Sequence, residues 1–323
     1  MSVLHYGDLH LTLETGETVL DALLRAEVPV PNSCRSGACQ SCRLRACAGE
    51  LPASAQVGLR PTQRERGYFL ACLCRPTADL AVAVGDDPPQ EAHVVAVDPL
   101  ARDIVRLRLR PEVRLDYRAG QFVTLLRDDG LARSYSLASL PEDEELELHV
   151  RVLPHGRMSR WIAEDLRPGD RVRIRGPEGE CFYSDGDPAQ PLLLVGVGTG
   201  LAPLHGIVRD ALRRGHTGPI TLMHGAVTPA GLYLADTLRD LARSHENLRY
   251  VRCALHGDPA EDLHIGGIEA VAAALLPKLA GHRVFLCGDP DRVHALRKQC
   301  FMRGARMNQI HADAFVTAPP PAP

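Results

Sequence analysis

Three closely spaced cysteines constrain the fold of this chain more than any other feature. Cys34, Cys39 and Cys42 follow the spacing C-x4-C-x2-C in "CRSGACQSC". Four thiolates hold a [2Fe-2S] cluster, and this spacing with a distant fourth cysteine is typical of plant-type centres. The fold must therefore bring one more cysteine to this loop from another part of the chain.

The fourth ligand has three nearby candidates, Cys47, Cys72 and Cys74. Cys47 follows the loop so closely that we expect it to leave on a strand and to point elsewhere. Cys72 and Cys74, in "GYFLACLCRP", would return from a separate element and close the site from its far side. The alternative is zinc, but zinc sites usually repeat a C-x2-4-C knuckle in two halves, and no second half is evident. The spacing favours a cluster and leaves both Cys72 and Cys74 open.

Composition excludes several classes of protein. The net charge of −3 over 323 residues gives no electrostatic reason to bind nucleic acid. The N-terminus lacks the basic and apolar regions of a secretory signal, so we expect a cytoplasmic protein. Its ten cysteines then argue against a disulfide framework: some would serve metal binding or redox chemistry, and the others would be small apolar core residues. Residues 191–208 carry no charge over the length of a short membrane span, but Pro203 and several glycines would make a poor helix. We expect a strand, a glycine turn and a helix there, no membrane partner, and a monomer.

The hydrophobic pattern changes twice along the chain. Residues 1–87 combine strand-like runs with one helical run, "TVLDALLRA", and end before the extended connector "DDPPQEA". Residues 92–187 contain six short β-like runs, which predict a small antiparallel barrel or sandwich. In residues 188–316 apolar strands alternate with helical stretches, which predicts a parallel sheet with crossover helices. The tail, 317–323, is rich in proline, and we expect it to be disordered.

Two further motifs carry chemistry. In "ARSYSLAS", Arg133 could pair with a phosphate, Tyr135 could pack on a planar cofactor and Ser136 could hydrogen-bond a ring nitrogen. The alternative is an ordinary strand with one exposed face and one core face. In "LLLVGVGTGLAPL", the backbone amides of Gly198 to Leu201 could receive a pyrophosphate. Because the spacing is G-x-G-x-G and no acid lies about 20 residues further on, an ordinary Rossmann dehydrogenase is disfavoured.

These motifs occur in an order that resembles a known family. The run "PNSCRSGACQSC" followed by "GYFLACLCRP", and then "YRAGQFVTL", "ARSYSLAS", "HGRMSRW", "LLLVGVGTGLAPL" and "VFLCGDP", resembles the reductase components of bacterial ring-hydroxylating dioxygenases, such as benzoate dioxygenase reductase. The resemblance implies a multidomain chain with an N-terminal β-grasp ferredoxin domain (α+β), a central antiparallel β-barrel that binds FAD, and a C-terminal α/β NAD domain with a parallel sheet. It also selects Cys72 as the fourth cluster ligand and leaves Cys74 without a role.

The resemblance further implies roles for individual residues. The residues implied for FAD are Arg133, Tyr135 and Ser136, with Gly156, Met158 and Ser159 near its pyrophosphate and Phe315 of "HADAF" covering the flavin beside Asp313. Those implied for the nicotinamide coenzyme are Gly198, Thr199, Gly200, Leu201, Cys287, Gly288 and Asp289. Ser136 and Cys287 are expected nearest the hydride path. Without the surrounding motif, Cys287 would be interpreted as an ordinary buried residue at the end of a strand.

The implied function is that of an electron-transfer reductase. Electrons would pass from NADH through FAD to the [2Fe-2S] cluster and on to a separate terminal oxygenase of the aromatic-ring dioxygenase class. NADH is favoured over NADPH because residues 215–238 contain no Arg or Lys to meet a 2′-phosphate. The alternatives are a reductase of the same build for a soluble di-iron monooxygenase or a deoxysugar dehydratase, or a non-catalytic zinc-binding protein.

Overall fold

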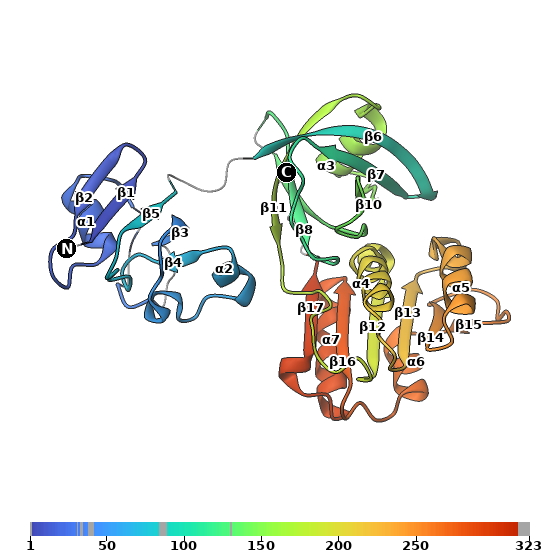
Figure 1. Ribbon diagram of the computed structural model, residues 1–323. Coiled ribbons are helices and arrows are strands. Elements are labelled where there is room, and N and C mark those ends of the chain that lie inside the picture. The colour runs from blue at the N-terminus through green and yellow to red at the C-terminus, as the bar shows by residue number, and fades with distance from the viewer. Residues whose placement is uncertain are drawn as a thin grey trace. The chain divides into compact units, whose positions relative to one another are not determined.

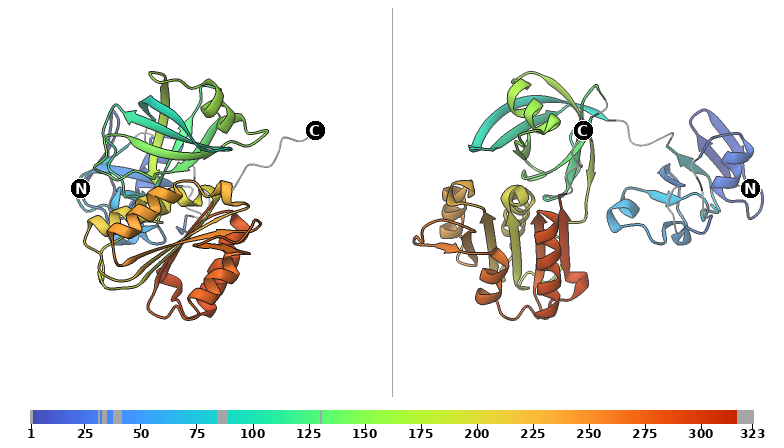
Figure 2. Two further views of the ribbon diagram at one scale, coloured as in Figure 1. Left: turned by 90° about the vertical axis from the view of Figure 1, so that its right-hand side faces the viewer. Right: turned by 180° about the vertical axis from the view of Figure 1, so that it is seen from behind.

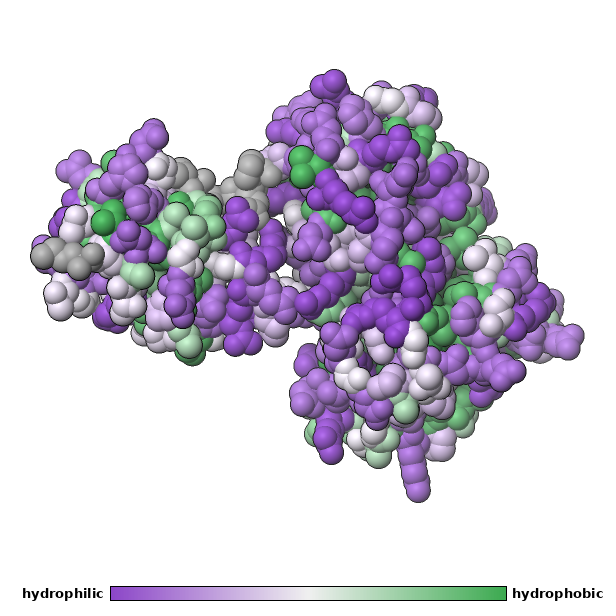
Figure 3. Space-filling view, viewed as in Figure 1, coloured by the Kyte–Doolittle hydropathy of each residue, from purple (hydrophilic) through white to green (hydrophobic). Residues whose placement is uncertain are grey.

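A computed structural model describes residues 2–30, 32, 35–37, 42–83, 89–129 and 131–315. These residues form two compact units, one on either side of residues 84–88. Within the described ranges, every helix is too short or too polar to cross a membrane. Hydrophilic side chains cover most of the face viewed in Figure 3, and apolar residues appear there only in small patches.

The first unit is a five-stranded mixed sheet with one main helix (Figure 1), as the predicted β-grasp fold requires. The strand order is β2-β1-β5-β3-β4, and β1 pairs with β5 in parallel. The Thr18 hydroxyl caps the helix by accepting a hydrogen bond from the Asp21 amide, 3.1 Å away. The elements are β1 (Val3–Tyr6), β2 (Leu9–Thr12), α1 (Val19–Arg25), β3 (Arg43–Ala48), η1 (Ala53–Gln56), α2 (Pro61–Glu65), β4 (Tyr68–Leu70) and β5 (Leu80–Val82).

The second unit begins with a six-stranded antiparallel barrel, which confirms the predicted barrel. Its strand order is β10-β7-β6-β11-β8-β9, and a bridge between Leu137 and Leu148 closes the sheet on itself. Inward-facing residues such as Leu107, Val123 and Leu148 are fully buried. The elements are β6 (Gln90–Ala101), β7 (Ile104–Pro111), β8 (Phe122–Leu126), β9 (Ala132–Ser136), β10 (Leu146–Arg151), α3 (Arg157–Arg160), the π-helical turn η2 (Trp161–Asp165) and β11 (Arg171–Glu178).

The same unit continues into a six-stranded parallel sheet, ordered β15-β14-β13-β12-β16-β17, which confirms the predicted α/β fold. Helices cover both faces, with α4 and α5 on one side and α6 and α7 on the other (Figure 2). The elements are β12 (Leu192–Val197), η3 (Gly198–Gly200), α4 (Leu201–Arg213), β13 (Ile220–Ala226), η4 (Pro229–Gly231), α5 (Ala235–Ser244), β14 (Leu248–Ala254), β15 (Leu263–Ile265), α6 (Ile268–Leu275), β16 (Arg283–Gly288), α7 (Pro290–Met302), η5 (Met307–Gln309) and β17 (Ile310–Ala314).

The uncharged stretch of residues 191–208 folds as predicted from its glycines and proline. It forms the buried strand β12, the glycine turn η3 and the first half of α4. Because parallel strands are covered on both faces, they are apolar along their whole length, and every residue from Leu192 to Gly196 is buried. The edge strands β15 and β17 were not predicted, since their short runs "LHI" and "IHADA" are too polar to be recognised as strands.

Candidate functional site

The cysteine loop and the turn after β4 lie together in the first unit. The Ala71 amide donates a hydrogen bond to the Cys42 carbonyl, 3.0 Å away, so Cys72 follows directly after a residue bonded to the end of the loop. Gly37 has φ +83°, and a Cβ there would lie 2.7 Å from Cδ1 of Leu73. The described part of the loop therefore packs on the turn that carries Cys72. Cys34 and Cys39, the other two predicted ligands, lie outside the described residues.

Cys42 and Cys72 suit a cluster better than Cys47 and Cys74, the other two cysteines that the structure describes in this unit. Both are almost fully buried, as an iron-sulfur cluster shielded from water requires. Cys47 lies exposed on β3, pointing away as expected. Cys74 is completely buried where its carbonyl accepts the Val19 amide of α1, and burial raises the pKa of its thiol to about 12. Cys74 thus lies in the packing beneath α1, while Cys72 lies on the turn that contacts the cysteine loop.

Strand β9 presents the first group of predicted FAD residues. Arg133 is exposed and Tyr135 half-buried, with its ring packed against the barrel core, while Ser136 is buried at the end of the strand. An exposed guanidinium beside a partly covered aromatic face fits a flavin nucleotide with a charged phosphate and a planar ring. The Ser136 hydroxyl donates to Oδ2 of Asp313 on β17 over 3.2 Å, so this strand reaches the last strand of the parallel sheet.

The second group of predicted FAD residues shapes the turn before α3. Gly156 is the N-cap of that helix, and a Cβ there would overlap the Ser159 hydroxyl. Ser159 Oγ accepts the Leu153 amide at 3.1 Å, and Met158 is buried in the barrel core. The side chains of Met158 and Ser159 are therefore bound within the protein, and a phosphate at this turn would meet backbone amides.

The barrel and the parallel sheet meet at Cys287. Its thiol lies 3.6 Å from that of Cys181, which follows the last barrel strand, and its backbone is in register with Asp313 on β17. Burial raises the pKa of the Cys287 thiol and of the Asp313 carboxyl. Ser136, Asp313 and Cys287 thus lie at one junction; the expected place of Ser136 and Cys287 near the hydride path stays a prediction.

Two neighbouring predicted residues have structural contacts of their own. Asp289 caps α7, because its Oδ1 accepts the Arg292 amide over 3.1 Å. The Phe315 amide donates to the Gly288 carbonyl over 2.8 Å, which holds the end of the chain's last strand beside the "CGDP" turn. These contacts place both residues at the carboxyl ends of β16 and β17.

The glycine turn after β12 has the close packing that a nucleotide loop needs. Gly198 has φ +56°, a conformation that favours glycine, and a Cβ on Gly200 would overlap the Cys287 carbonyl. The amide of Leu201 is already bonded back into the turn, to the carbonyls of Gly198 and Thr199. Of the four amides predicted to bind a pyrophosphate, that of Leu201 already donates its hydrogen bond within the turn.

A cavity of about 480 Å³ lies in front of this turn. Its lining combines Val197 and Gly198 with residues 226–228 and 230–231, which follow β13, and with four barrel residues. Two of these are Arg102 and Arg151; Arg151 Nη1 lies 3.5 Å from where a Gly198 Cβ would be, and Arg151 Nε is 3.1 Å from Oδ2 of Asp103. Sequence reasoning missed both arginines, because they come from a different lobe than the glycine motif. A pocket with backbone amides on one wall and guanidinium groups on the other fits a dinucleotide pyrophosphate.

A cysteine-loop unit of β-grasp type, a barrel with a flavin-binding strand and a nucleotide pocket on a parallel sheet together define an iron-sulfur flavoprotein reductase. Family models agree, matching a 2Fe-2S iron-sulfur cluster binding domain at residues 7–77, an oxidoreductase FAD-binding domain at 91–183 and an oxidoreductase NAD-binding domain at 194–298. The chain belongs to the ferredoxin–NAD(P)+ reductase components that carry these three domains in this order.

Relatives with this domain order cover nearly the whole chain. The reductase component of the naphthalene 1,2-dioxygenase/salicylate 5-hydroxylase systems of Ralstonia is 36% identical over 95% of this chain and 96% of its own. The reductase component of phenol 2-monooxygenase from Pseudomonas is 32% identical over 95% and 92%. The crystal structure of a cytochrome P450 reductase from Amycolatopsis matches with a TM-score of 0.66 and 34% identity, over 98% and 99%. The chain is accordingly an NAD(P)H-dependent oxidoreductase with FAD and a [2Fe-2S] cluster.

Proposed function

We propose that this reductase uses NADH and delivers electrons to the terminal oxygenase of an aromatic-ring dioxygenase system. The observation that supports a direct route from coenzyme to flavin is the junction of Ser136, Asp313 and Cys287, which joins the barrel to the parallel sheet in one compact unit. When bound, the nicotinamide supplies a hydride, FAD splits the electron pair into single electrons, and the cluster carries these one at a time.

The chain's own contribution is binding and positioning. Gly198 and Arg151 line one cavity and would hold the coenzyme phosphates. The buried Ser136 and Cys287 would help to keep water from the place where nicotinamide and flavin meet. Arg133 and Tyr135, on one strand, would hold the flavin, and Phe315 would cover it. Cys42 and Cys72, together with Cys34 and Cys39, would supply the four thiolates of the cluster.

The choice of NADH rests on charge. The segment that follows β13, where the adenosine ribose would lie, supplies no cation to the cavity, and Asp103 adds a carboxylate. An acid in such a pocket suits a free ribose hydroxyl, whereas a 2′-phosphate requires a cation. Arg102 and Arg151 would serve the pyrophosphate, which both coenzymes share. A kcat/KM with NADPH above that with NADH would contradict this choice.

The acceptor is proposed from the relatives. One of those described above is named for a dioxygenase system, whereas the others are named for a monooxygenase and a cytochrome P450. A ferredoxin is a further candidate, because the Ralstonia relative is named a ferredoxin–NAD(P)+ reductase component. The candidate acceptors are distinguished by measuring how fast one preparation of the reductase reduces each purified acceptor at equal concentration.

We also propose that the protein works as a monomer in the cytoplasm.

Two cysteine variants test the electron route. Cys72→Ala should lose the cluster absorbance and the reduction of cytochrome c, yet keep FAD and the NADH-driven reduction of a small dye. Cys74→Ala should keep all four, since it removes only a buried thiol at a cost of about 1–2 kcal/mol in stability. Visible and electron paramagnetic resonance spectra report the cluster independently of activity. Loss of the cluster from Cys74→Ala and not from Cys72→Ala would reassign the ligand, and purified protein without flavin absorbance would overturn the function itself.

A further inference from the structure

A buried polar cluster outside the cofactor sites joins the barrel to the nucleotide-binding lobe. Residues two apart on a strand share a face, so Glu147, His149 and Arg151 of β10 all face the same way. That face packs on the other lobe: His149 Nδ1 lies 3.1 Å from the Tyr233 hydroxyl, and Arg151 covers Gly198. His205 enters the same space from α4.

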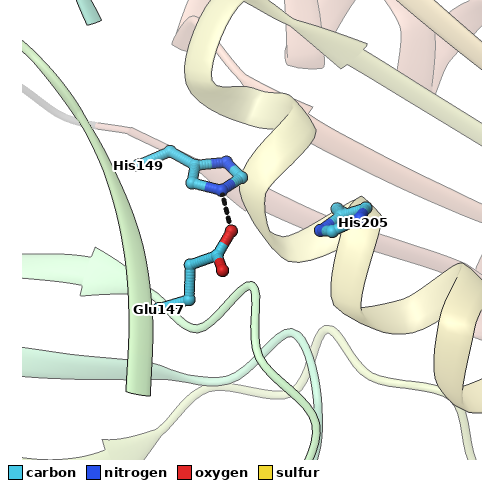
Figure 4. Close-up of side chains that lie close together, drawn as sticks. All are labelled: Glu147, His149 and His205. Carbon is cyan, nitrogen blue, oxygen red and sulfur yellow. Dashed lines mark hydrogen bonds and ion pairs between the residues drawn. The ribbon is translucent and has the colours of Figure 1, made fainter. Parts of the chain in front are cut away.

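The three side chains Glu147, His149 and His205 form a compact set of metal-ligand atoms. One carboxylate oxygen and one nitrogen from each ring all lie within 4.8 Å of one another. Figure 4 shows the Glu147 carboxylate and the His149 ring in contact, at 2.8 Å, with His205 facing them from the helix. Zinc bonds of about 2.0–2.1 Å place ligand atoms roughly 3.3 Å apart in a tetrahedron, so these atoms would have to move closer together to bind zinc.

His205 gives an independent sign that a ligand is missing. The residue is only 7% exposed, and its Nδ1 is buried without a hydrogen-bond partner among the residues that the structure describes. Its neighbours along α4, Leu204, Ile207 and Val208, are fully buried apolar residues, so this imidazole is a costly occupant of its position. A cation bound by this imidazole would supply the interaction that it lacks.

The surroundings hold the other two ligands ready. The Tyr233 hydroxyl engages Nδ1 of His149, which fixes the ring and directs Nε2 at Glu147, as outer partners do at metal sites. Each imidazole would bind the cation through a ring nitrogen, and Glu147 would bind it through a carboxylate oxygen.

The positive charges nearest to these ligands are partly neutralised by carboxylates. Arg106, which lies opposite His149 on β7, is 3.1 Å from Asp98, which also pairs with Arg108 at 3.6 Å. Arg209, one turn after His205 on α4, faces Asp143 at 3.5 Å. Glu147 supplies the site with a negative charge of its own.

We propose that Glu147, His149 and His205 bind a divalent cation of the zinc class, with water as the fourth ligand. Two imidazoles and one carboxylate with an open position are ligands that zinc accepts. Since two ligands come from β10 and one from α4, the cation would fasten the FAD-binding barrel to the nucleotide-binding lobe. It would also fix the strand that carries Arg151.

Zinc content and zinc coordination in the cluster-loaded, FAD-loaded protein test this proposal. The full chain is incubated with zinc chloride, freed of loosely bound metal by gel filtration and analysed for zinc and iron. We expect one zinc per chain in the wild type and none at this site in His205→Leu, which keeps the cluster cysteines and fills the buried position with an apolar side chain. His216→Leu, which changes another buried histidine, should keep its zinc.

Glu147→Gln serves as a second variant, because its amide preserves the shape of the side chain, and it should bind zinc at least tenfold more weakly. X-ray absorption at the zinc edge should show only nitrogen and oxygen neighbours near 2.0–2.1 Å. Sulfur neighbours near 2.3 Å would place the zinc on cysteines and overturn the proposal. Equal zinc in the wild type and in His205→Leu, or no zinc in either, would overturn it as well.

Discussion

Arg151 lies on a barrel strand but reaches the nucleotide turn of the other lobe. Its guanidinium covers Gly198 and is held by Asp103 over 3.1 Å, so it is oriented before any coenzyme arrives. A pre-oriented arginine loses little side-chain freedom on binding a phosphate. At the scale of single residues, coenzyme affinity is therefore shared between the two lobes.

Arg151→Ala should weaken coenzyme binding with little effect on kcat. The contact is to the phosphates, which do not react, so it is equally strong in the ground state and the transition state. A hydrogen bond to a charged group contributes about 1.5–3 kcal/mol, which corresponds to a 10- to 100-fold rise in KM for NADH. Steady-state dye reduction measures both constants. Arg110→Ala, which removes an exposed arginine of the same barrel, is the control; an unchanged KM in Arg151→Ala would contradict this role.

Asp313 should make stability depend on pH. Burial raises the pKa of its carboxyl, against the opposing hydrogen bond from Ser136, and the thiol of Cys287 is its other polar neighbour. The folded chain therefore binds this proton more tightly than the unfolded chain does. The stabilisation is complete below the unfolded pKa, near 3.8, and is lost as the pH rises through the folded pKa.

Asp313→Asn should accordingly unfold at a higher temperature than the wild type at pH 7 and at the same temperature near pH 4. Asparagine keeps an oxygen for the Ser136 hydroxyl but carries no charge to bury. Thermal unfolding followed by circular dichroism across this range measures the difference. A constant difference at all pH values would show that the ionisation of Asp313 is not its source.

At the scale of elements, periodicity predicted most of the structure. The six barrel runs, the strands β12, β13, β14 and β16, and the helices α4 to α7 were all recognisable, because their apolar spacing matches the face that each one buries. Strand β17 was not recognisable, because its run "IHADA" is too polar to indicate a strand. It is part of the sheet because its backbone pairs in parallel with β16. The contact from Ser136 to Asp313 joins residues 177 apart and could not be read from local sequence.

The close contact between the glycine turn η3 and strand β16, here called the crossing, gives a prediction at the scale of elements. In Gly200→Ala the new Cβ would overlap the Cys287 carbonyl, so the turn must move away from the strand. Overpacking of this kind costs about 1–3 kcal/mol, and here it also displaces the phosphate-binding amides. We expect lower stability to urea, followed by the fluorescence of Trp161, the chain's single tryptophan, together with a higher KM for NADH.

Gly281→Ala is the matched control for this crossing. Gly281 has φ +81° with open space around its Cα, so alanine there pays backbone strain of about 1–2 kcal/mol and touches nothing. Its stability should fall by a similar amount while its KM stays unchanged. If both variants raised the KM for NADH alike, the cause would be a general loss of stability in this lobe and not the displaced contact at Gly200.

At the scale of the whole molecule, each of the two folded units holds the candidate residues for different cofactors. All candidate cluster ligands precede residue 84, and all candidate FAD and coenzyme residues follow residue 88. Each unit has a hydrophobic core of its own, one built around Leu4, Leu20 and Phe69 and the other around the barrel and the parallel sheet. We therefore expect the two halves of the electron route to fold independently of each other.

Residues 89–323 expressed alone should consequently fold, bind FAD and reduce a small dye with NADH at close to the rate of the full chain. They should fail to reduce cytochrome c at a comparable rate, because single-electron delivery to a protein is assigned to the cluster, which this fragment lacks. Adding the separately expressed residues 1–88 with their cluster should restore part of that rate in proportion to concentration, since the covalent link no longer supplies a high local concentration. Full cytochrome c reduction by the fragment alone would mean that electrons leave directly from the flavin unit, and the cysteine loop would then be a side branch of the route and not its exit.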